Sequence, residues 1–198
     1  MNMNLEKTKK MSRSLRIVIQ TFYWASVVCV IVLSIAFVVV LLLPENKFIV
    51  PADSRDNVGF SIDGLVGYSI GLNTAAELSL KPIYQSICFM AAVISAGLSV
   101  VFKQISRILK TVEANRPFSE ENSRSLTVIG FILLIGSFVI RVVEGIVARA
   151  IIDTLNIQNM QVNYSIDGFM IIAGLLILIL AGVFKYGSYL QQEYDTTL

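Results

Sequence analysis

The sequence has 198 residues, of which 55% are hydrophobic and 15% are charged, and its mean hydropathy is +0.72. These proportions are too apolar for an ordinary soluble domain and indicate a protein of the lipid bilayer. The net charge of +2 argues against nucleic-acid binding by bulk electrostatics. Because the chain has no histidine, it lacks the commonest metal ligand and the usual proton carrier near neutral pH.

Four apolar segments predict the fold class. A helix that crosses a bilayer needs about 20 mostly apolar residues, and candidate spans lie at about residues 17–43, 82–102, 127–151 and 168–186. We therefore predict an all-α membrane protein: a four-helix transmembrane bundle with a small extracytoplasmic β-element. Residues 1–198 then form a single integral membrane domain, which leaves no room for a soluble catalytic domain.

The first segment has the basic flank of a signal peptide. Its charge-free stretch, residues 22–43, is longer than the roughly 7–15 residues of a signal core, and no small-residue cleavage site precedes Pro44. We interpret this segment as an uncleaved membrane anchor.

The loop at residues 44–81 contains a hairpin signal. Two β-prone runs flank Asp63 and Gly64, a pair that suits a tight turn because both residues tolerate positive φ. The pattern Val-x-Phe/Tyr-Ser-Ile of these runs recurs at residues 162–166, inside the second such loop, 152–167. We predict that residues 162–166 pair with the hairpin; the alternative is chance similarity between two interface segments.

The middle loop, residues 103–126, continues the second helix. Apolar residues at helical spacing predict an amphipathic extension that ends before Pro117, because the residue before a proline disfavours the α conformation. Ser119, followed by Glu120 and Glu121, predicts a new helix capped by the serine. This region is either a docking surface or a plain helical hairpin at the lipid headgroups.

The third segment carries a candidate intramembrane polar cluster of Arg141, Glu144 and Arg149. A charge near the bilayer centre costs on the order of 2.5–3.5 kcal/mol, so Arg141 and Glu144 are expected to face inward and to compensate each other. Arg149 can extend to the outer interface. The functional interpretation is a cavity for an ion, a peptide or a lipid headgroup, and the structural one is an ion pair that fixes helix register.

The remaining features carry no chemistry. Ala91, Ser95 and Ser99 form a small-residue stripe that predicts close helix packing. Asp167 suits either a strand end or the N-cap of the last helix. Cys29 and Cys88 lie inside predicted spans without metal-ligand spacing. Neither hydrolase, metalloprotease, P-loop nor dinucleotide motifs occur, so we expect a non-enzyme with no catalytic, cofactor-binding or metal-binding residues.

Charge asymmetry predicts the orientation. The N-terminal segment and the loop 103–126 each carry five basic residues, whereas the loop 44–81 is acidic on balance and residues 153–167 contain no lysine or arginine. Basic residues accumulate on the cytoplasmic side. We therefore expect a bacterial inner (cell) membrane protein with both termini in the cytoplasm, whose basic segments also suit anionic lipid headgroups.

Two strings resemble a known family. The first is Ile-Leu-Lys110-Thr-Val-Glu-Ala-Asn115-Arg-Pro117-Phe118-Ser-Glu-Glu-Asn122, followed by Leu-x-x-Ile-Gly at 126–130; the second is Leu-Ala-Gly-Val-Phe-Lys185-Tyr-Gly187-Ser-Tyr-Leu-Gln191-Gln-Glu193-Tyr-Asp195-Thr-Thr-Leu198. Together they resemble the YoaS-like family of small four-helix bacterial membrane proteins, a domain of unknown function. The resemblance implies four spans and genetic neighbourhood with a small helix-turn-helix regulator, and it transfers no catalytic residues.

These strings suggest a cytoplasmic docking surface of Pro117, Phe118, Gln191, Glu193 and Asp195. Our leading hypothesis is a non-enzymatic sensor or regulator that couples an envelope signal to a cytosolic DNA-binding partner. The alternative is a small transporter or an immunity factor against a membrane-active peptide. The bilayer is the other expected partner, direct nucleic-acid binding is not expected, and a homo-oligomer is left open.

Overall fold

Four long helices make up most of the molecule. The structure is a computed structural model that describes residues 2–50, 58–62, 66–70, 78–114, 116–157, 162 and 168–196. The helices are α1 (Asn2–Leu42), α2 (Lys81–Glu113), α3 (Glu120–Leu155) and α4 (Gly168–Thr196). Each of them contains a stretch that is long and apolar enough to cross a membrane. The prediction of four spanning helices is therefore confirmed, and the chain is a multi-pass membrane protein.

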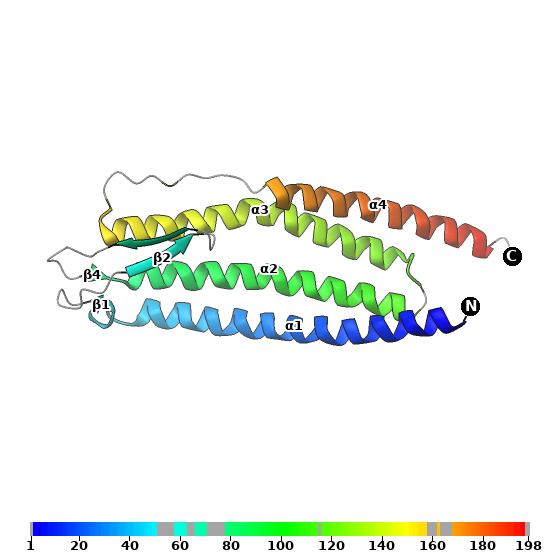
Figure 1. The fold of residues 1–198 in the computed structure, drawn as a ribbon, viewed down its shortest axis with the longest axis horizontal. Helices are drawn as coiled ribbons and strands as arrows, with labels where there is room; N and C mark the ends of the chain where they lie inside the picture. Colours follow the sequence, from blue (N-terminus) through cyan, green and yellow to red (C-terminus); the bar gives the residue numbers. More distant parts are fainter. Residues whose placement is uncertain are drawn as a thin grey trace.

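The helices pack in chain order. α1 lies against α2, α2 against α3, and α3 against α4, as Figure 1 shows. Within the described residues, no contact of similar extent joins α1 to α4. Among the described residues, the four helices thus form an open array. The short turn at residues 114–119 makes α2 and α3 antiparallel neighbours. In a bilayer, lipid can cover the outer faces of α1 and α4.

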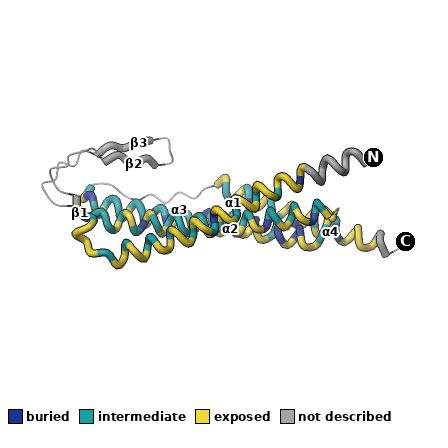
Figure 2. Tube along the Cα trace, turned by 90° about the horizontal axis from the view of Figure 1, so that it is seen from below, coloured by how far each residue is buried: buried dark blue, intermediate teal, exposed yellow. Residues whose placement is uncertain are grey.

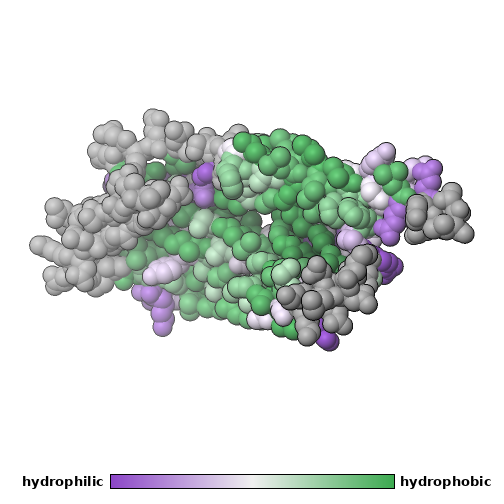
Figure 3. Space-filling model, turned by 45° about the vertical axis from the view of Figure 1, so that its right-hand side comes forward, coloured by the Kyte–Doolittle hydropathy of each residue, from purple (hydrophilic) through white to green (hydrophobic). Residues whose placement is uncertain are grey.

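The surface of this array is apolar. Among the described residues only Ile129, Val143, Leu155 and Ala181 are buried apolar side chains. Large apolar side chains are exposed on all four helices, and the tube in Figure 2 is mostly yellow and teal. Figure 3 shows hydrophobic side chains over the middle of the molecule and hydrophilic ones nearer its ends. Such a surface would be unfavourable in water and is suited to hydrocarbon.

The end that bears both termini extends beyond a bilayer. α1 has 41 residues, α2 has 33 and α3 has 36, whereas about 20 residues cross the hydrocarbon. The predicted extension of the second helix is confirmed, because α2 runs to Glu113. Ser119 caps α3, as predicted, by accepting a hydrogen bond from the Asn122 backbone N–H.

The strands are short. β2 (Val58–Ile62) and β3 (Val66–Ile70) pair antiparallel, with Phe60 opposite Tyr68, where the sequence predicts a hairpin. A second ladder, which the sequence did not predict, joins β1 (Ile49–Val50) to β4 (Leu78–Ser79). It follows a short 3-10 helix, η1 (Glu45–Phe48). Of residues 162–166 only Val162 is described, so their predicted pairing with the hairpin lies outside the described residues.

The two ends of the array are not equivalent, because α4 begins opposite the middle of α3. A Cβ on Gly136 of α3 would lie 3.3 Å from the Cε of Met170, which is in the first turn of α4. α3 continues for 19 further residues to Leu155, a length of about 28 Å. The second half of α3 therefore extends past the start of α4 (Figure 1).

Candidate functional site

The intramembrane polar cluster is an ion pair that is only partly buried. Arg141 Nη1 lies 2.7 Å from Glu144 Oε2, and the two side chains are 27% and 39% exposed. The Nε of Arg141 is buried without a hydrogen-bond partner in the described part of the chain. Arg149 is exposed two turns later and stands apart from this pair. The structure thus brings together two of the three predicted residues.

The pair is level with the middle of the charge-free part of α2, but it lies past the start of α4. A hydrogen bond between Thr111 and Asn122 fixes the register of α2 against α3. Arg141 lies 19 residues after Asn122, and Ala92 lies 19 residues before Thr111, so Arg141 is level with Ala92. Ala92 is midway between Lys81 and Lys103, which bound the charge-free part of α2. The charges are therefore at mid-depth relative to α2, whereas relative to α4, whose first turn is level with Gly136, they lie beyond the start of the helix.

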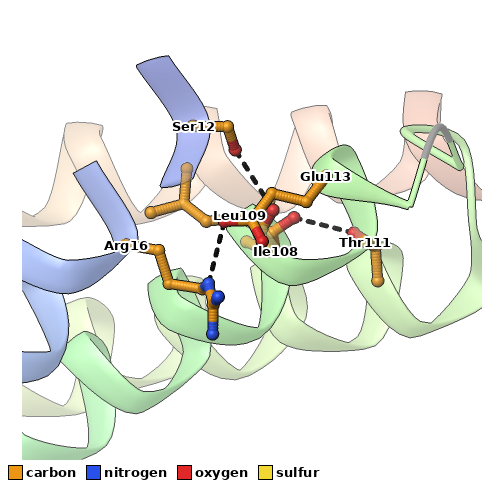
Figure 4. Close-up of polar contacts among 6 residues, drawn as sticks. All are labelled: Ser12, Arg16, Ile108, Leu109, Thr111 and Glu113. Atoms are coloured by element: carbon orange, nitrogen blue, oxygen red, sulfur yellow. Dashed lines mark hydrogen bonds and ion pairs between the residues drawn. The ribbon is translucent and has the colours of Figure 1, made fainter. Parts of the chain in front are cut away.

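The second candidate region lies at the end that bears both termini, where polar contacts join neighbouring helices. Between α1 and α2, the Ser12 hydroxyl donates a hydrogen bond to the Leu109 carbonyl over 3.2 Å. Arg16 Nε lies 2.8 Å from Glu113 Oε1. Figure 4 shows both contacts reaching from α1 to the last turns of α2. These contacts hold α1 to α2 beyond the apolar part of the helices.

Between α2 and α3, the turn is built around a fully buried asparagine. Asn122 is 0% exposed, and its Nδ2 donates to the Pro117 carbonyl over 2.7 Å. The Thr111 hydroxyl lies 2.6 Å from Asn122 Oδ1 and 2.7 Å from the Ile108 carbonyl. Buried amides need such partners, because an unpaired one costs about 1–3 kcal/mol. The turn is therefore a fixed structure.

Between α3 and α4, a hydroxyl and an aromatic ring make the connection. The Ser123 hydroxyl donates to the Ala181 carbonyl over 2.8 Å. The Phe118 ring packs on Phe184 with 5.3 Å between centroids. A Cβ on Gly187 would lie only 2.9 Å from Cδ1 of Phe118, so the glycine makes room for the ring. We call the joined region the terminal platform; its members are Ser12, Arg16, Leu109, Thr111, Glu113, Pro117, Phe118, Asn122, Ser123, Ala181, Phe184 and Gly187.

The predicted docking residues are only partly gathered there. Pro117 and Phe118 belong to the terminal platform, and Phe118 remains 47% exposed. Gln191 and Glu193 are exposed on α4, beyond the residues that Phe118 contacts. Asp195 falls in the last turn of α4, and its side chain lies outside what the structure describes. The two sequence strings therefore meet, but at Phe184 and Gly187.

Sequence reasoning missed the residues that fix the terminal platform. Thr111 and Asn122 stand inside the first family-like string, and Ser123 follows it. Sequence reasoning also missed a stripe of buried small residues on α4. They recur every seven positions, at Gly174, Ala181 and Ser188. Residues seven positions apart lie on the same helix face after about two turns. This spacing was the sequence signal that could have identified the stripe.

Neither cysteines nor acidic clusters add a further site. Cys29 is exposed, Cys88 is half-buried, and neither forms a disulfide. Within the described ranges, no group of three or more His, Cys, Asp or Glu side chains could hold a metal ion.

Comparison with known proteins identifies a family. No curated protein and no solved structure matches the chain. A family model described as "Protein of unknown function (DUF2975)" matches residues 50–198, which include all of α2, α3 and α4. The narrower resemblance to the YoaS-like group stays a prediction. Because the match covers most of the sequence, the chain belongs to the DUF2975 family.

Proposed function

We propose that this protein is a non-enzymatic membrane regulator that couples an envelope signal to a cytosolic partner. The observation that supports this proposal best is the terminal platform. Hydrogen bonds, an ion pair and a ring contact link α1 to α2, α2 to α3 and α3 to α4 at one end of the array. Continuous helices connect this end to the strands at the other, so a displacement of one end can be transmitted to the other as rigid-body movement.

The distribution of charge supports an orientation with the terminal platform inside the cell. Lys103, Arg107, Lys110 and Arg124 are exposed at this end, and both termini lie here (Figure 1). Basic residues favour the cytoplasmic side of the inner membrane. In this orientation the half-exposed Phe118 and the exposed end of α4 face the cytoplasm and form the docking surface.

The test uses the small helix-turn-helix regulator that the family resemblance implies as a genetic neighbour. Cells would carry a fluorescent regulator and either the intact chain, a chain lacking residues 191–198, or Phe118→Ala. We expect the intact chain to recruit the regulator to the membrane and both variants to recruit less of it. Phe131→Ala, which alters a 53% exposed phenylalanine in the apolar part of α3, is the matched control. No recruitment by the intact chain, or equal recruitment by all variants, contradicts the proposal.

The Arg141–Glu144 pair favours a second candidate function, a small transporter or an immunity factor against a membrane-active peptide. The pair is partly exposed and is level with the middle of α2, and charged side chains inside a membrane often mark a pathway or binding site. If this function is correct, Arg141→Leu should abolish transport or protection in a protein that still folds. A loss of thermal stability alone, with activity retained, would make the pair structural.

A further inference from the structure

We propose that one face of α2 binds an anionic phospholipid, with an acyl chain along Phe89, Ala96 and Val100 and the headgroup at Lys103, Arg107 and Lys110. These six positions are separated by seven, four, three, four and three residues. Steps of three, four and seven residues return to one face of a helix. The face thus changes from apolar to basic at Lys103, in the order in which a lipid changes from acyl chain to phosphate.

All six residues on this face are exposed. Phe89 is 41% and Val100 is 38% exposed, and Ala96, Lys103, Arg107 and Lys110 are also exposed. α1 touches this face only partly: the Phe37 ring of α1 lies 6.2 Å from the Phe89 ring, centroid to centroid, and Phe89 still keeps 41% of its surface exposed. The three cations extend over seven residues, about 10 Å along the helix axis. This is a little more than the depth of one headgroup layer, about 5–8 Å, and the long, flexible basic side chains can span the difference.

Among the side chains that the structure describes, the cations on this face have no carboxylate partner. Nearby Arg16 pairs with Glu113, and Arg124 pairs with Glu120. In contrast, no described Asp or Glu lies within 4.0 Å of Lys103, Arg107 or Lys110. The hydrogen bond of Arg107 is a long one, 3.3 Å from Nη1 to Gln104 Oε1. Three unneutralised positive charges beside an apolar strip match a phosphate headgroup attached to an acyl chain.

The site is independent of the proposed regulatory function, because it needs neither the docking surface nor a protein partner. It differs from the general effect of a basic cytoplasmic side, which depends on the number of charges and not on their arrangement. A bound lipid of this kind should remain on the protein when bulk lipid is removed.

The test is native mass spectrometry of the purified full-length chain in detergent, titrated with cardiolipin, phosphatidylglycerol or phosphatidylcholine. We expect the intact chain to retain the two anionic lipids more tightly than phosphatidylcholine, and the retention to fall with added salt. Each cation near an anionic headgroup contributes about fivefold in affinity. The triple variant Lys103→Gln, Arg107→Gln, Lys110→Gln should therefore bind at least tenfold more weakly.

Two further variants make the outcome specific. A control triple, Lys47→Gln, Arg149→Gln and Lys185→Gln, removes the same charge from exposed positions on η1, α3 and α4, and it should keep full affinity. A charge-retaining triple, Lys103→Arg, Arg107→Lys and Lys110→Arg, should bind like the intact chain, which excludes misfolding as the cause of a loss. Equal binding by the glutamine triple, equal loss in the control triple, or equal retention of phosphatidylcholine overturns the proposal.

Discussion

At the scale of single residues, the most consequential group is the Thr111 hydroxyl. It is the described partner of the buried Asn122 Oδ1, so Thr111→Val removes a donor from a site that water does not reach. We expect a stability loss of about 1–3 kcal/mol, because a buried acceptor would remain unpaired. Thermal unfolding in detergent would measure it as a lower midpoint.

Thr21→Val is the matched control for this change. The Thr21 hydroxyl bonds only to the Ile17 carbonyl one turn earlier in the same helix, at an exposed position. Its removal should alter the unfolding midpoint little, since the carbonyl keeps its backbone partner. Equal losses in both variants would show that the Thr111–Asn122 contact does not stabilise the turn.

The residue types at positions 111 and 122 could not by themselves reveal the Thr111–Asn122 contact. Sequence reasoning placed the cap at Ser119 correctly, because capping depends on neighbours within one turn. Thr111 and Asn122 lie on different helices, and their pairing depends on how the turn brings α2 and α3 together. The same limit applies to Arg141 and Glu144: their spacing predicted the ion pair, but not the partial exposure that follows from where α4 begins.

At the scale of elements, α3 and α4 approach each other closely at Gly130 and Gly174. A Cβ on Gly174 would lie 2.9 Å from Leu134 Cγ and 3.1 Å from the Gly130 carbonyl. Because the carbonyl belongs to the backbone, it cannot move aside, and Gly174→Ala should separate the helices. We expect a loss of about 1–3 kcal/mol from overpacking, measured by thermal unfolding in detergent.

Two other glycines on α4 provide comparisons for the destabilisation expected from Gly174→Ala. A Cβ on Gly182 would meet nothing within 4 Å, so Gly182→Ala should be neutral or stabilising by up to about 1 kcal/mol through helix propensity. Gly187→Ala should fall between the two, because only the half-exposed Phe118 ring must shift. A destabilisation by Gly182→Ala as large as that by Gly174→Ala would contradict the assigned interface.

Helix existence was predictable from the sequence, but helix register was not. The apolar runs gave all four helices, since length and composition suffice for that. The predicted small-residue stripe on α2 is only half-buried at Ala91, Ser95 and Ser99, whereas the tight contact uses glycines of α3 and α4. Small residues indicate that helices can approach closely, but they do not identify the partner helix. The β1–β4 ladder was missed because two-residue strands carry no periodic signal.

At the scale of the whole molecule, the two helix hairpins are displaced along the membrane normal. The charge-free part of α2 lies between Lys81 and Lys103. In α3 the corresponding part lies between Arg124 and Arg141, and Arg141 is level with the middle of the α2 segment. Lys81 anchors the other end of the first hairpin by donating to the Leu41 and Leu43 carbonyls at the end of α1. The displacement brings the charges of α3 level with the middle of α2 and past the start of α4.

The orientation of the whole array is open to a direct test. Both termini lie at the same end (Figure 1), and exposed cations gather there. A protease-cleavable tag added before Met1 or after Leu198 should therefore resist protease applied to spheroplasts, because both tags would be cytoplasmic. A tag inserted after Lys47, on η1 near the opposite end, should be digested in the same spheroplasts. Lysed cells, in which all three tags are accessible, provide the control. Digestion of both terminal tags, with protection of the tag after Lys47, would show that the orientation is the reverse of the expected one. The terminal platform would then lie outside the cell, which excludes a cytosolic partner, although the four spans would remain.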